Sequence, residues 1–241
     1  MILDIDLGNT RLKWRETTRS HKAMESFALP LAHIPPDLNV PVRGNPERIR
    51  IATVRGPSAE VALTQWSRRQ FGITPEFARS TVAAAGVTNA YEIPARLGVD
   101  RWLAMLAAFN TLPEALVVLD FGSAITADGV SAEGYHRGGY IAPGLRMMTH
   151  SLLLNTDLVR FEGESTGCIA PGSSTELAVS SGVLAASVGF ADEVWSRLSP
   201  MCGAKIAVIT GGDANTVAPH LRFPLRLVPD LVLDGLALAL P

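Results

Sequence analysis

Short apolar stretches separated by polar turns run along the whole chain. In the first, from Ile2 to Asp6, apolar residues alternate with aspartates, which predicts a strand. The turn Leu-Gly-Asn-Thr at 7–10 follows, and Leu12 with Trp14 predicts a strand that returns from it. Glycine and asparagine tolerate backbone angles that other residues avoid, so the chain can reverse here. The chain is therefore expected to begin as strand, turn and strand.

The same pattern recurs near the middle of the chain. A predicted buried strand from Glu114 ends at Asp120, followed by Gly122, Ser123 and a return through Ile125. Asp120 lies 114 residues after Asp6 (120 − 6), which is close to half of the 241 residues. A chance likeness of two strand-turns is one interpretation. The other, which the repeat favours, is a duplicated fold with a cleft between two copies.

The remaining pattern alternates strands with helices and favours an α/β architecture. Further strands are expected at 26–29, 50–55, 205–210 and 225–230, and helices at 59–71, 103–109, 145–154 and 231–240. Ser173 and Glu176 have the spacing of a capping box, which predicts a helix from there through Trp195. Residues 72–96 are expected to be rich in loops. No role can be argued for residues 16–48 and 155–170.

Composition excludes several classes of protein. The net charge of −2, with 18% charged and 47% hydrophobic residues, gives no reason to expect binding to nucleic acid or to an anionic membrane. Two cysteines and five scattered histidines indicate neither a disulfide framework nor a zinc site. Asp4 and Asp6 stand where a signal peptide would be apolar, and no uninterrupted apolar run approaches the ~18–20 residues of a membrane helix. We therefore expect a cytoplasmic globular protein.

Four short motifs are candidates for chemistry. They are Asp-x-Gly-Asn-Thr at 6–10, Gly-x-Asp-Arg at 98–101, Asp-x-Gly-Ser-Ala at 120–124 and Thr-Gly-Gly at 210–212. Backbone amides in such turns can bind an anion, and a nearby carboxylate can hold the metal that accompanies a phosphate. Each motif also has a purely structural interpretation. The first is a hairpin corner, and Asp100 is an N-cap worth ~1 kcal/mol to the helix that follows.

In order and spacing, the four motifs together resemble the type III pantothenate kinases of the acetate and sugar kinase/Hsp70/actin superfamily. The resemblance covers essentially the whole chain, from Asp6 through Gly144 and Thr175 to Asp213. It implies two RNase H-like (actin-like ATPase) domains facing a nucleotide-binding cleft. We expect them at residues 1–112, with the first phosphate loop, and 113–241, with the second loop and the Thr-Gly-Gly turn.

The resemblance also implies a role for each motif. The residues expected to bind ATP are Asp6, Leu7, Gly8, Asn9, Thr10, Arg11, Leu12, Lys13, Ser123, Thr210, Gly211 and Gly212. The residues expected to bind pantothenate are Tyr91, Gly98, Val99, Asp100, Arg101 and Thr175. Asp6 would lie near Mg²⁺, and Asp120 would help to bind a monovalent cation, K⁺ or NH₄⁺. Ser123 stands where the family usually has threonine, and the exchange keeps the hydroxyl.

The implied reaction is phosphorylation of pantothenate by ATP to 4'-phosphopantothenate, the first step of coenzyme A biosynthesis. Asp100 would be the general base for the primary hydroxyl of pantothenate, since a carboxylate at a helix start is favoured in its charged form. Arg101 can pair with the substrate carboxylate in a bidentate geometry. The family also implies a homodimer. The alternatives are a non-catalytic regulatory or binding relative and a kinase for another small alcohol.

Overall fold

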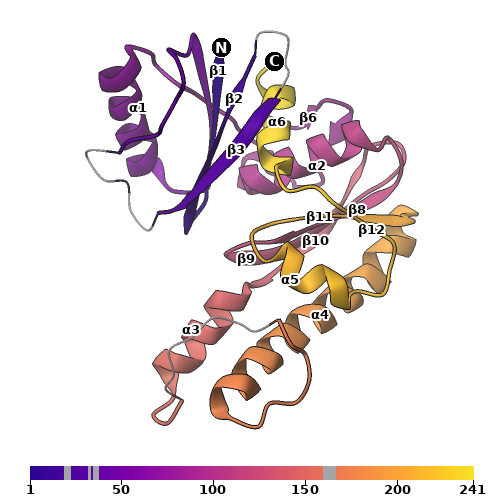
Figure 1. The fold of residues 1–241 in the computed structure, drawn as a ribbon. Helices are drawn as coiled ribbons and strands as arrows, with labels where there is room; N and C mark the ends of the chain where they lie inside the picture. The colour runs from indigo at the N-terminus through magenta and orange to yellow at the C-terminus, as the bar shows by residue number, and fades with distance from the viewer. Residues whose placement is uncertain (19–22, 32–33, 35–37, 160–166) are drawn as a thin grey trace. The chain divides into compact units, whose positions relative to one another are not determined.

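The chain folds into two units, each built on a five-stranded sheet (Figure 1). The computed structural model describes residues 1–18, 23–31, 34, 38–159 and 167–241. One unit contains Met1–Leu112 together with Asp230–Pro241, and the other contains Pro113–Pro229. Parts of the two segments for which the sequence suggests no role, 16–48 and 155–170, lie outside the described residues.

The first sheet has the strand order β3-β2-β1-β4-β5. Its strands are β1 (Ile2–Leu7), β2 (Arg11–Thr17), β3 (Ala23–Pro30), β4 (Arg48–Thr53) and β5 (Glu76–Phe77). The central strand β1 pairs antiparallel with β2 and parallel with β4. In the loop-rich stretch 72–96 the chain also forms a two-stranded ribbon of β6 (Ala83–Ala84) and β7 (Val87–Thr88), then the 3-10 turn η1 (Pro94–Arg96).

The second sheet repeats this order as β10-β9-β8-β11-β12. Its strands are β8 (Leu116–Phe121), β9 (Ala124–Val130), β10 (His136–Pro143), β11 (Ile206–Thr210) and β12 (Leu225–Leu227). Asp6 on β1 is in register with Lys13 and Ala52, and Asp120 on β8 is in register with Thr126 and Thr210. The half-chain repeat predicted from the sequence is therefore confirmed as a repeat of topology.

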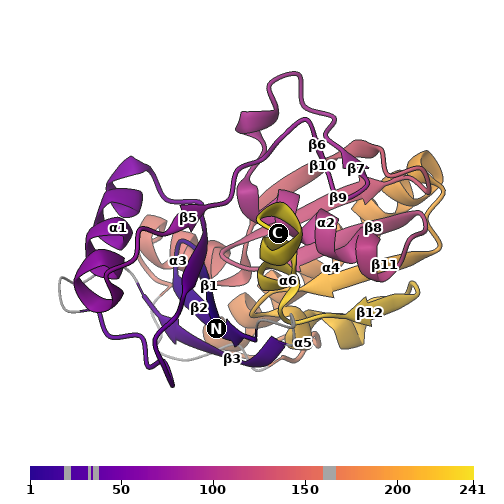
Figure 2. The same ribbon diagram turned by 90° about the horizontal axis from the view of Figure 1, so that it is seen from above.

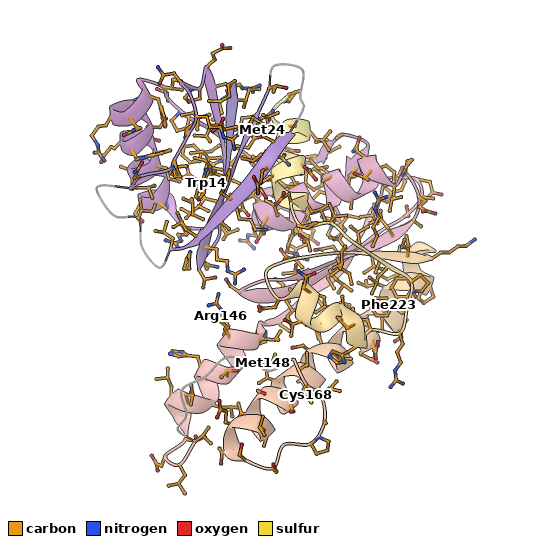
Figure 3. All side chains as sticks on the ribbon, in the orientation of Figure 1. Trp14, Met24, Arg146, Met148, Cys168 and Phe223 are labelled. Atoms are coloured by element: carbon orange, nitrogen blue, oxygen red, sulfur yellow. The ribbon has the colours of Figure 1, made fainter. Side chains whose placement is uncertain are left out.

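Both faces of the first sheet are covered by helices. The helices are α1 (Pro57–Phe71), α2 (Val99–Thr111) and α6 (Leu231–Ala239). Leu3 and Ile5 share an apolar core with Leu63 and Trp66 of α1. Trp14 of β2 belongs to the same core and is only 4% exposed (Figure 3).

The last helix departs from the predicted domain boundaries. From the sequence, residues 230–241 are expected in the C-terminal domain, but α6 packs against α2 of the first unit, as the two views show (Figures 1 and 2). A Cβ atom at Gly235 would lie 2.7 Å from the Cβ atom of Leu103. The two helices therefore approach so closely at this point that only glycine fits without a shift.

The core of the second unit lies between its sheet and the long helix α4 (Thr175–Cys202). The buried positions Leu184, Val188, Ala191 and Leu198 recur at helical spacing on one face of α4. Phe223 joins this core (Figure 3). Its ring stacks on that of Trp195 with 4.7 Å between ring centroids. The other helical segments of this unit are α3 (Leu145–Asn155), α5 (Ala214–Val217) and η2 (Ala218–His220).

Helix α4 bears on the expectation that no stretch of the chain resembles a membrane helix. It is the one helix among the described residues that is long and apolar enough to cross a membrane, with a mean hydropathy of 1.3 over 18 residues. The sequence predicts this helix but shows no uninterrupted apolar run in it, because polar residues such as Ser180 and Ser187 lie between its apolar residues. Both serines are buried in the unit, as expected of a core helix in a folded domain.

Two predicted helix caps are displaced in the structure. The N-cap of α2 is Gly98, which makes no side-chain cap, and Asp100 lies in the first turn. The N-cap of α4 is Ser174, whose hydroxyl accepts a hydrogen bond from the amide of Leu177 at 3.2 Å, so the box at Ser173 and Glu176 is off by one residue. The N-cap interpretation of Asp100 is therefore wrong.

A row of charged side chains crosses the buried face of the first sheet opposite α1. Arg15, Asp4 and Arg50 are register partners on β2, β1 and β4, and each is at most 5% exposed. The Arg50 guanidinium donates to both Asp4 carboxylate oxygens at 2.7 and 3.1 Å. Arg15 donates to Asp234 of α6 at 2.6 Å, and Arg50 donates to the carbonyl of Leu240 at 3.0 Å. The row therefore joins α6 to the sheet.

We expect Asp4→Asn to lower the free energy of unfolding of the first unit by about 3–5 kcal/mol, because Arg50 would remain buried without its countercharge. Three of the four tryptophans (Trp14, Trp66 and Trp102) lie in this unit, so urea unfolding followed by tryptophan fluorescence reports mainly on it.

The control is Glu60→Gln, which breaks the ion pair of Glu60 with the exposed Arg79 and should cost less than about 1 kcal/mol. Equal losses in the two variants would contradict the importance assigned to the buried row.

Candidate functional site

The predicted first phosphate loop is a tight turn between β1 and β2. The amide of Gly8 donates to the carbonyl of Arg11 at 3.0 Å, which closes the turn. Asn9 and Thr10 at its tip are exposed, and Asp6 and Lys13 face each other in register where the two strands enter it. A carboxylate and an ammonium group therefore flank a polar turn, an arrangement that suits a metal-bound phosphate.

Two residues expected in this loop have a narrower role. The side chains of Leu7 and Leu12 are fully buried in the core of the first unit. They pair with each other across the base of the turn. Any contribution of these two residues to a ligand is therefore limited to their backbone groups.

Arg55 is a functional candidate that the sequence analysis does not identify. It follows β4, and its Nε and Nη2 atoms donate to the carbonyls of Gly8 at 3.0 Å and Asn9 at 2.7 Å. Nη2 also donates to the carbonyl of Leu31. The parallel pairing of β1 with β4 brings Arg55 to the turn, and that pairing cannot be read from local sequence.

A cavity of about 260 Å³ lies beside the start of α2. It is lined by Thr53, Val54, Arg55, Ala78, Arg79, Ser80, Ala95, Arg96, Leu97, Gly98 and Val99. The hydroxyl of Ser80, which is 8% exposed, donates to the carbonyl of Leu97 at 2.8 Å and fixes the chain just before Gly98. Two of the predicted substrate residues, Gly98 and Val99, are thus part of a preformed hollow.

Glycine at position 98 makes room for the carboxylate of Asp100. A Cβ atom at Gly98 would lie 2.7 Å from Asp100 Oδ1, too close for any other residue without a shift. The same oxygen accepts a hydrogen bond from the amide of Arg101 at 2.7 Å. The Gly-x-Asp spacing therefore lets the aspartate fold back over the start of its own helix, next to two residues that line the cavity.

Arg101 and Tyr91 are brought together as a pair. Arg101 Nη1 donates to the hydroxyl of Tyr91 at 2.9 Å, and its guanidinium lies 5.8 Å from the ring centroid. Arg101 is only 5% exposed. The two residues, which are ten positions apart in the sequence, thus form one hydrogen-bonding group.

The second predicted phosphate loop is the turn between β8 and β9. The amide of Gly122 donates to the carbonyl of Ala124 at 3.1 Å, and the carbonyl of Ser123 accepts from the amide of Gly144 at 3.1 Å. Gly144 precedes α3, and a Cβ atom there would lie 2.5 Å from the Ser123 carbonyl oxygen. The start of α3 is therefore packed directly on this turn.

The Thr-Gly-Gly motif lies beside the same turn. Thr210 is in register with Asp120, and Gly211 has a φ of 103°, which side chains rarely adopt. A Cβ atom at Gly211 would lie 2.5 Å from Asp120 Oδ1 and closer still to the backbone of Phe121. The amide of Asp213 donates to the carbonyl of Phe121 at 3.0 Å. The structure thus brings together Asp120, Thr210 and Gly211.

Two of the predicted residues are exposed on the second unit. Gly212 is exposed in the turn after Gly211, and Thr175 is the exposed first residue of α4. Both belong to the second unit, whereas Tyr91 and Gly98 to Arg101 belong to the first.

The carboxylates of Asp6 and Asp120 suit a metal ion that is partly held by a bound ligand. They do not suit a metal ion held by protein side chains alone. Among the described residues no group of three or more His, Cys, Asp or Glu side chains could hold a metal ion. Mg²⁺ in kinases is typically bound by one or two carboxylates plus the substrate phosphates, and Asp6 beside the first turn fits that pattern. Asp120 Oδ1 and the Phe121 carbonyl oxygen both lie within 2.5 Å of the position that a Cβ atom of Gly211 would take, so two oxygen atoms that could bind a cation lie close together there.

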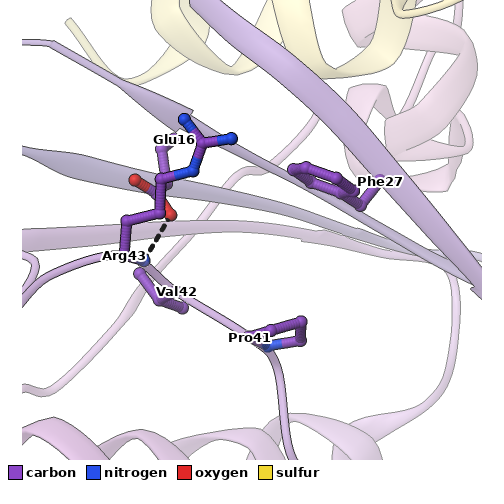
Figure 4. A pocket seen from close by; sticks show the side chains of 5 residues that line it. All are labelled: Glu16, Phe27, Pro41, Val42 and Arg43. Carbon is purple, nitrogen blue, oxygen red and sulfur yellow. Dashed lines mark hydrogen bonds between the residues drawn. The ribbon is translucent and has the colours of Figure 1, made fainter.

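Another hollow, of about 240 Å³, lies on the outer strands of the first sheet (Figure 4). It is lined by Glu16, Phe27, Pro41, Val42 and Arg43, and the Glu16 carboxylate accepts a hydrogen bond from the amide of Arg43 at 2.7 Å. None of the predicted site residues lines it, so we assign it no part in the chemistry.

We expect Gly211→Ala to destabilise the second unit by about 1–3 kcal/mol, since the new Cβ atom meets backbone at a positive φ. Gly182→Ala is the control. Gly182 lies on the exposed side of α4 with nothing within 4 Å, so alanine should stabilise the helix by up to about 1 kcal/mol. Thermal unfolding followed by circular dichroism measures both changes, and a loss of stability in the two variants alike would contradict the close packing described for Gly211.

Comparison with known proteins identifies the family of the chain. A family model described as type III pantothenate kinase matches residues 2–197. A type III pantothenate kinase from Chromohalobacter salexigens is 38% identical over 246 residues, covering 100% of this chain and 88% of that relative.

Two solved structures share the fold at low sequence identity. A protein described as a Baf family transcriptional activator from Campylobacter jejuni superposes with a TM-score of 0.61 at 22% identity, covering 98% of this chain and 95% of the other. An activator of 2-hydroxyisocaproyl-CoA dehydratase from Clostridium difficile, solved with ADPNP, gives 0.53 at 11% identity, covering 99% and 92%. The predicted actin-like α/β fold is confirmed, and the chain belongs to the type III pantothenate kinase family.

Proposed function

We propose that this protein transfers the γ-phosphate of ATP to pantothenate, giving 4'-phosphopantothenate in the first step of coenzyme A biosynthesis. The family match over residues 2–197 is the observation that carries the proposal. The duplicated Asp-x-Gly turns and the cavity beside Gly98 support it, because phosphoryl transfer needs bound phosphates and a positioned acceptor hydroxyl.

In this proposal Asp100 is the general base that accepts the proton of the attacking hydroxyl. Its place in the first turn of α2 favours the ionised carboxylate, because the helix N-terminus carries partial positive charge. Its Oδ1 accepts the amide of Arg101, so the carboxylate is oriented before a substrate binds.

The substrate would bind along the cavity at Gly98 and Val99. To the paired Tyr91 and Arg101 we assign recognition of the pantothenate carboxylate, and the hydrogen bond that orients the arginine toward the tyrosine hydroxyl supports this assignment. Thr175, from the second unit, is the remaining residue assigned to the substrate.

The nucleotide would bind through the two turns. From the first turn we assign it Asp6 to Lys13, with Leu7 and Leu12 contributing backbone only. From the second unit we assign it Ser123, Thr210, Gly211 and Gly212. The two adjacent glycines support this assignment, since a flat or charged group can approach a glycine turn closely.

Two cations belong to the proposal. Mg²⁺ enters with ATP, and Asp6 is the carboxylate that we assign to it. When bound, it neutralises charge on the transferred phosphate. Asp120 and the carbonyl of Phe121 are the donors we assign to a monovalent cation, K⁺ or NH₄⁺, since monovalent cations of this kind are bound by oxygen atoms.

We further propose that the enzyme is a cytoplasmic homodimer that binds neither nucleic acid nor membrane. Large apolar side chains are exposed along the edge strand β10 and on α3, at Tyr140, Ile141, Met147, Leu152 and Leu154. Such a group of side chains is typical of a surface that another protein covers.

Replacement of Asp100 by Asn should lower kcat for pantothenate at least about 100-fold, since the amide cannot accept the proton. The asparagine oxygen can still accept a hydrogen bond from the Arg101 amide, so the fold should be unchanged. The affinity for ATP should stay within about twofold of that of the original protein. A coupled assay for ADP and calorimetric titration with ATP provide these two measurements.

Glu92→Gln is the matched control, because Glu92 is an exposed carboxylate near Tyr91 outside the assigned site. Unchanged turnover in Asp100→Asn would contradict the assignment of the base. Turnover with other small alcohols but not with pantothenate would instead contradict the proposed substrate.

The rate should depend on the monovalent cation and should be higher in KCl or NH₄Cl than in NaCl at equal ionic strength. Asp120→Asn should remove most of this difference, since a neutral amide binds a cation less strongly than a carboxylate does. Equal rates of the original protein in all three salts would contradict the cation site.

A further inference from the structure

The guanidinium of Arg55 is directed at the backbone of the first phosphate turn. Its three hydrogen-bond acceptors are the carbonyls of Gly8, Asn9 and Leu31. No carboxylate of the described residues lies within ion-pair distance of Arg55. Burial lowers the pKa of its guanidinium, which nonetheless stays charged at neutral pH. A cation is thus held against the turn by neutral acceptors alone.

In the second unit the turn after β8 is held by a backbone hydrogen bond. Register aligns Ala52 on β4 with Thr210 on β11, because they pair with Asp6 and Asp120 respectively. Three residues further on, Arg55 therefore corresponds to Asp213. Asp213 reaches the end of β8 with its backbone amide, at 3.0 Å from the carbonyl of Phe121.

The first unit has Val54, not a glycine turn, directly after β4. The close backbone approach made by Gly211 in the second unit is replaced by a long side chain that spans the distance. In both units the segment after the neighbouring parallel strand thus holds the phosphate turn, by backbone in one and by an arginine in the other.

Arg55 also lines the cavity that contains Gly98 and Val99. The same side chain therefore contacts the turn assigned to ATP and borders the hollow assigned to pantothenate. Arg79 and Arg96 line the same cavity. Among the hydrogen bonds of the described residues, neither of these two arginines has one to the turn. Arg79 is bound instead by Glu60 at 2.6 Å.

We propose that Arg55 is a positioning residue that fixes the first phosphate turn through the carbonyls of Gly8 and Asn9, so that the turn is ordered before ATP binds. The inference rests on the proposed function for the identity of the nucleotide. Holding a binding turn in its bound conformation raises affinity, because less ordering is left to occur on binding.

The test compares Arg55→Ala and Arg55→Lys with Arg68→Ala. Arg68 is an exposed arginine of α1 in the same unit, and its Nε donates to the neutral hydroxyl of Thr74. Arg68→Ala therefore removes one positive charge, as Arg55→Ala does, and breaks no ion pair with Thr74. Calorimetric titration with Mg-ATP is the main readout, because it does not require phosphoryl transfer. The KM values for ATP and pantothenate form the second readout.

We expect Arg55→Ala to weaken ATP binding about tenfold or more, with the KM for pantothenate changed less than about twofold. Arg55→Lys should remain impaired at least about fivefold, since an ammonium group cannot reproduce the spread of Nε and Nη2 over separate carbonyls. Arg68→Ala should bind ATP like the original protein. If Arg55→Ala does not fold, the lysine variant carries the same test.

Full ATP affinity in Arg55→Lys would overturn the proposal, because charge alone would then suffice. A rise confined to the KM for pantothenate would also overturn it, since Arg55 would then contact the substrate. A third outcome is that the original protein proves unable to phosphorylate pantothenate while Arg55→Ala still lowers its affinity for ATP. That result would support the positioning role and refute the proposed function.

Discussion

The buried row of Arg15, Asp4 and Arg50 is the interaction on which the first unit depends. A carboxylate between two guanidinium groups satisfies charges that would otherwise be costly to bury. The row fixes β1 between its two neighbours and attaches α6 through Asp234. Side chains alternate along β1, so the strand that holds Asp4 in the interior places Asp6, two residues later, at the entrance of the turn.

The two units show how one topology can serve two turns of different construction. Four residues separate Leu7 from Leu12 in the first turn, and three separate Phe121 from Ile125 in the second. The shorter turn is packed between Gly144 and Gly211, where space allows no side chain. The longer turn lies against an arginine. Duplicated strands therefore keep the aspartates equivalent, while the segments around each turn have diverged.

Local pattern was sufficient to predict the features formed by neighbouring residues. The strand-turn-strand elements at Asp6 and Asp120 and the helix after Gly98 follow from alternation and from glycine positions, and the structure contains them. Features that depend on pairing between distant segments were not predictable. Arg55 reaches the first turn only because β4 lies beside β1, and α6 joins the first unit through contacts with residues more than a hundred positions earlier. The exact N-cap of α4 could not be predicted either, because the adjacent residues Ser173 and Ser174 are equally good caps in sequence.

The position of α6 has a consequence for how a new chain acquires its shape. Residues 113–229 are continuous, so the second unit has all of its parts once that stretch has left the ribosome. The first unit lacks α6 until residues 230–241 follow, and until then Arg15 and Arg50 lack their partners in that segment. The strand that carries Asp6 is therefore made before residues 113–229, yet the unit around that strand closes only after the second unit has all of its parts. During biogenesis, the middle of the chain is complete before its beginning.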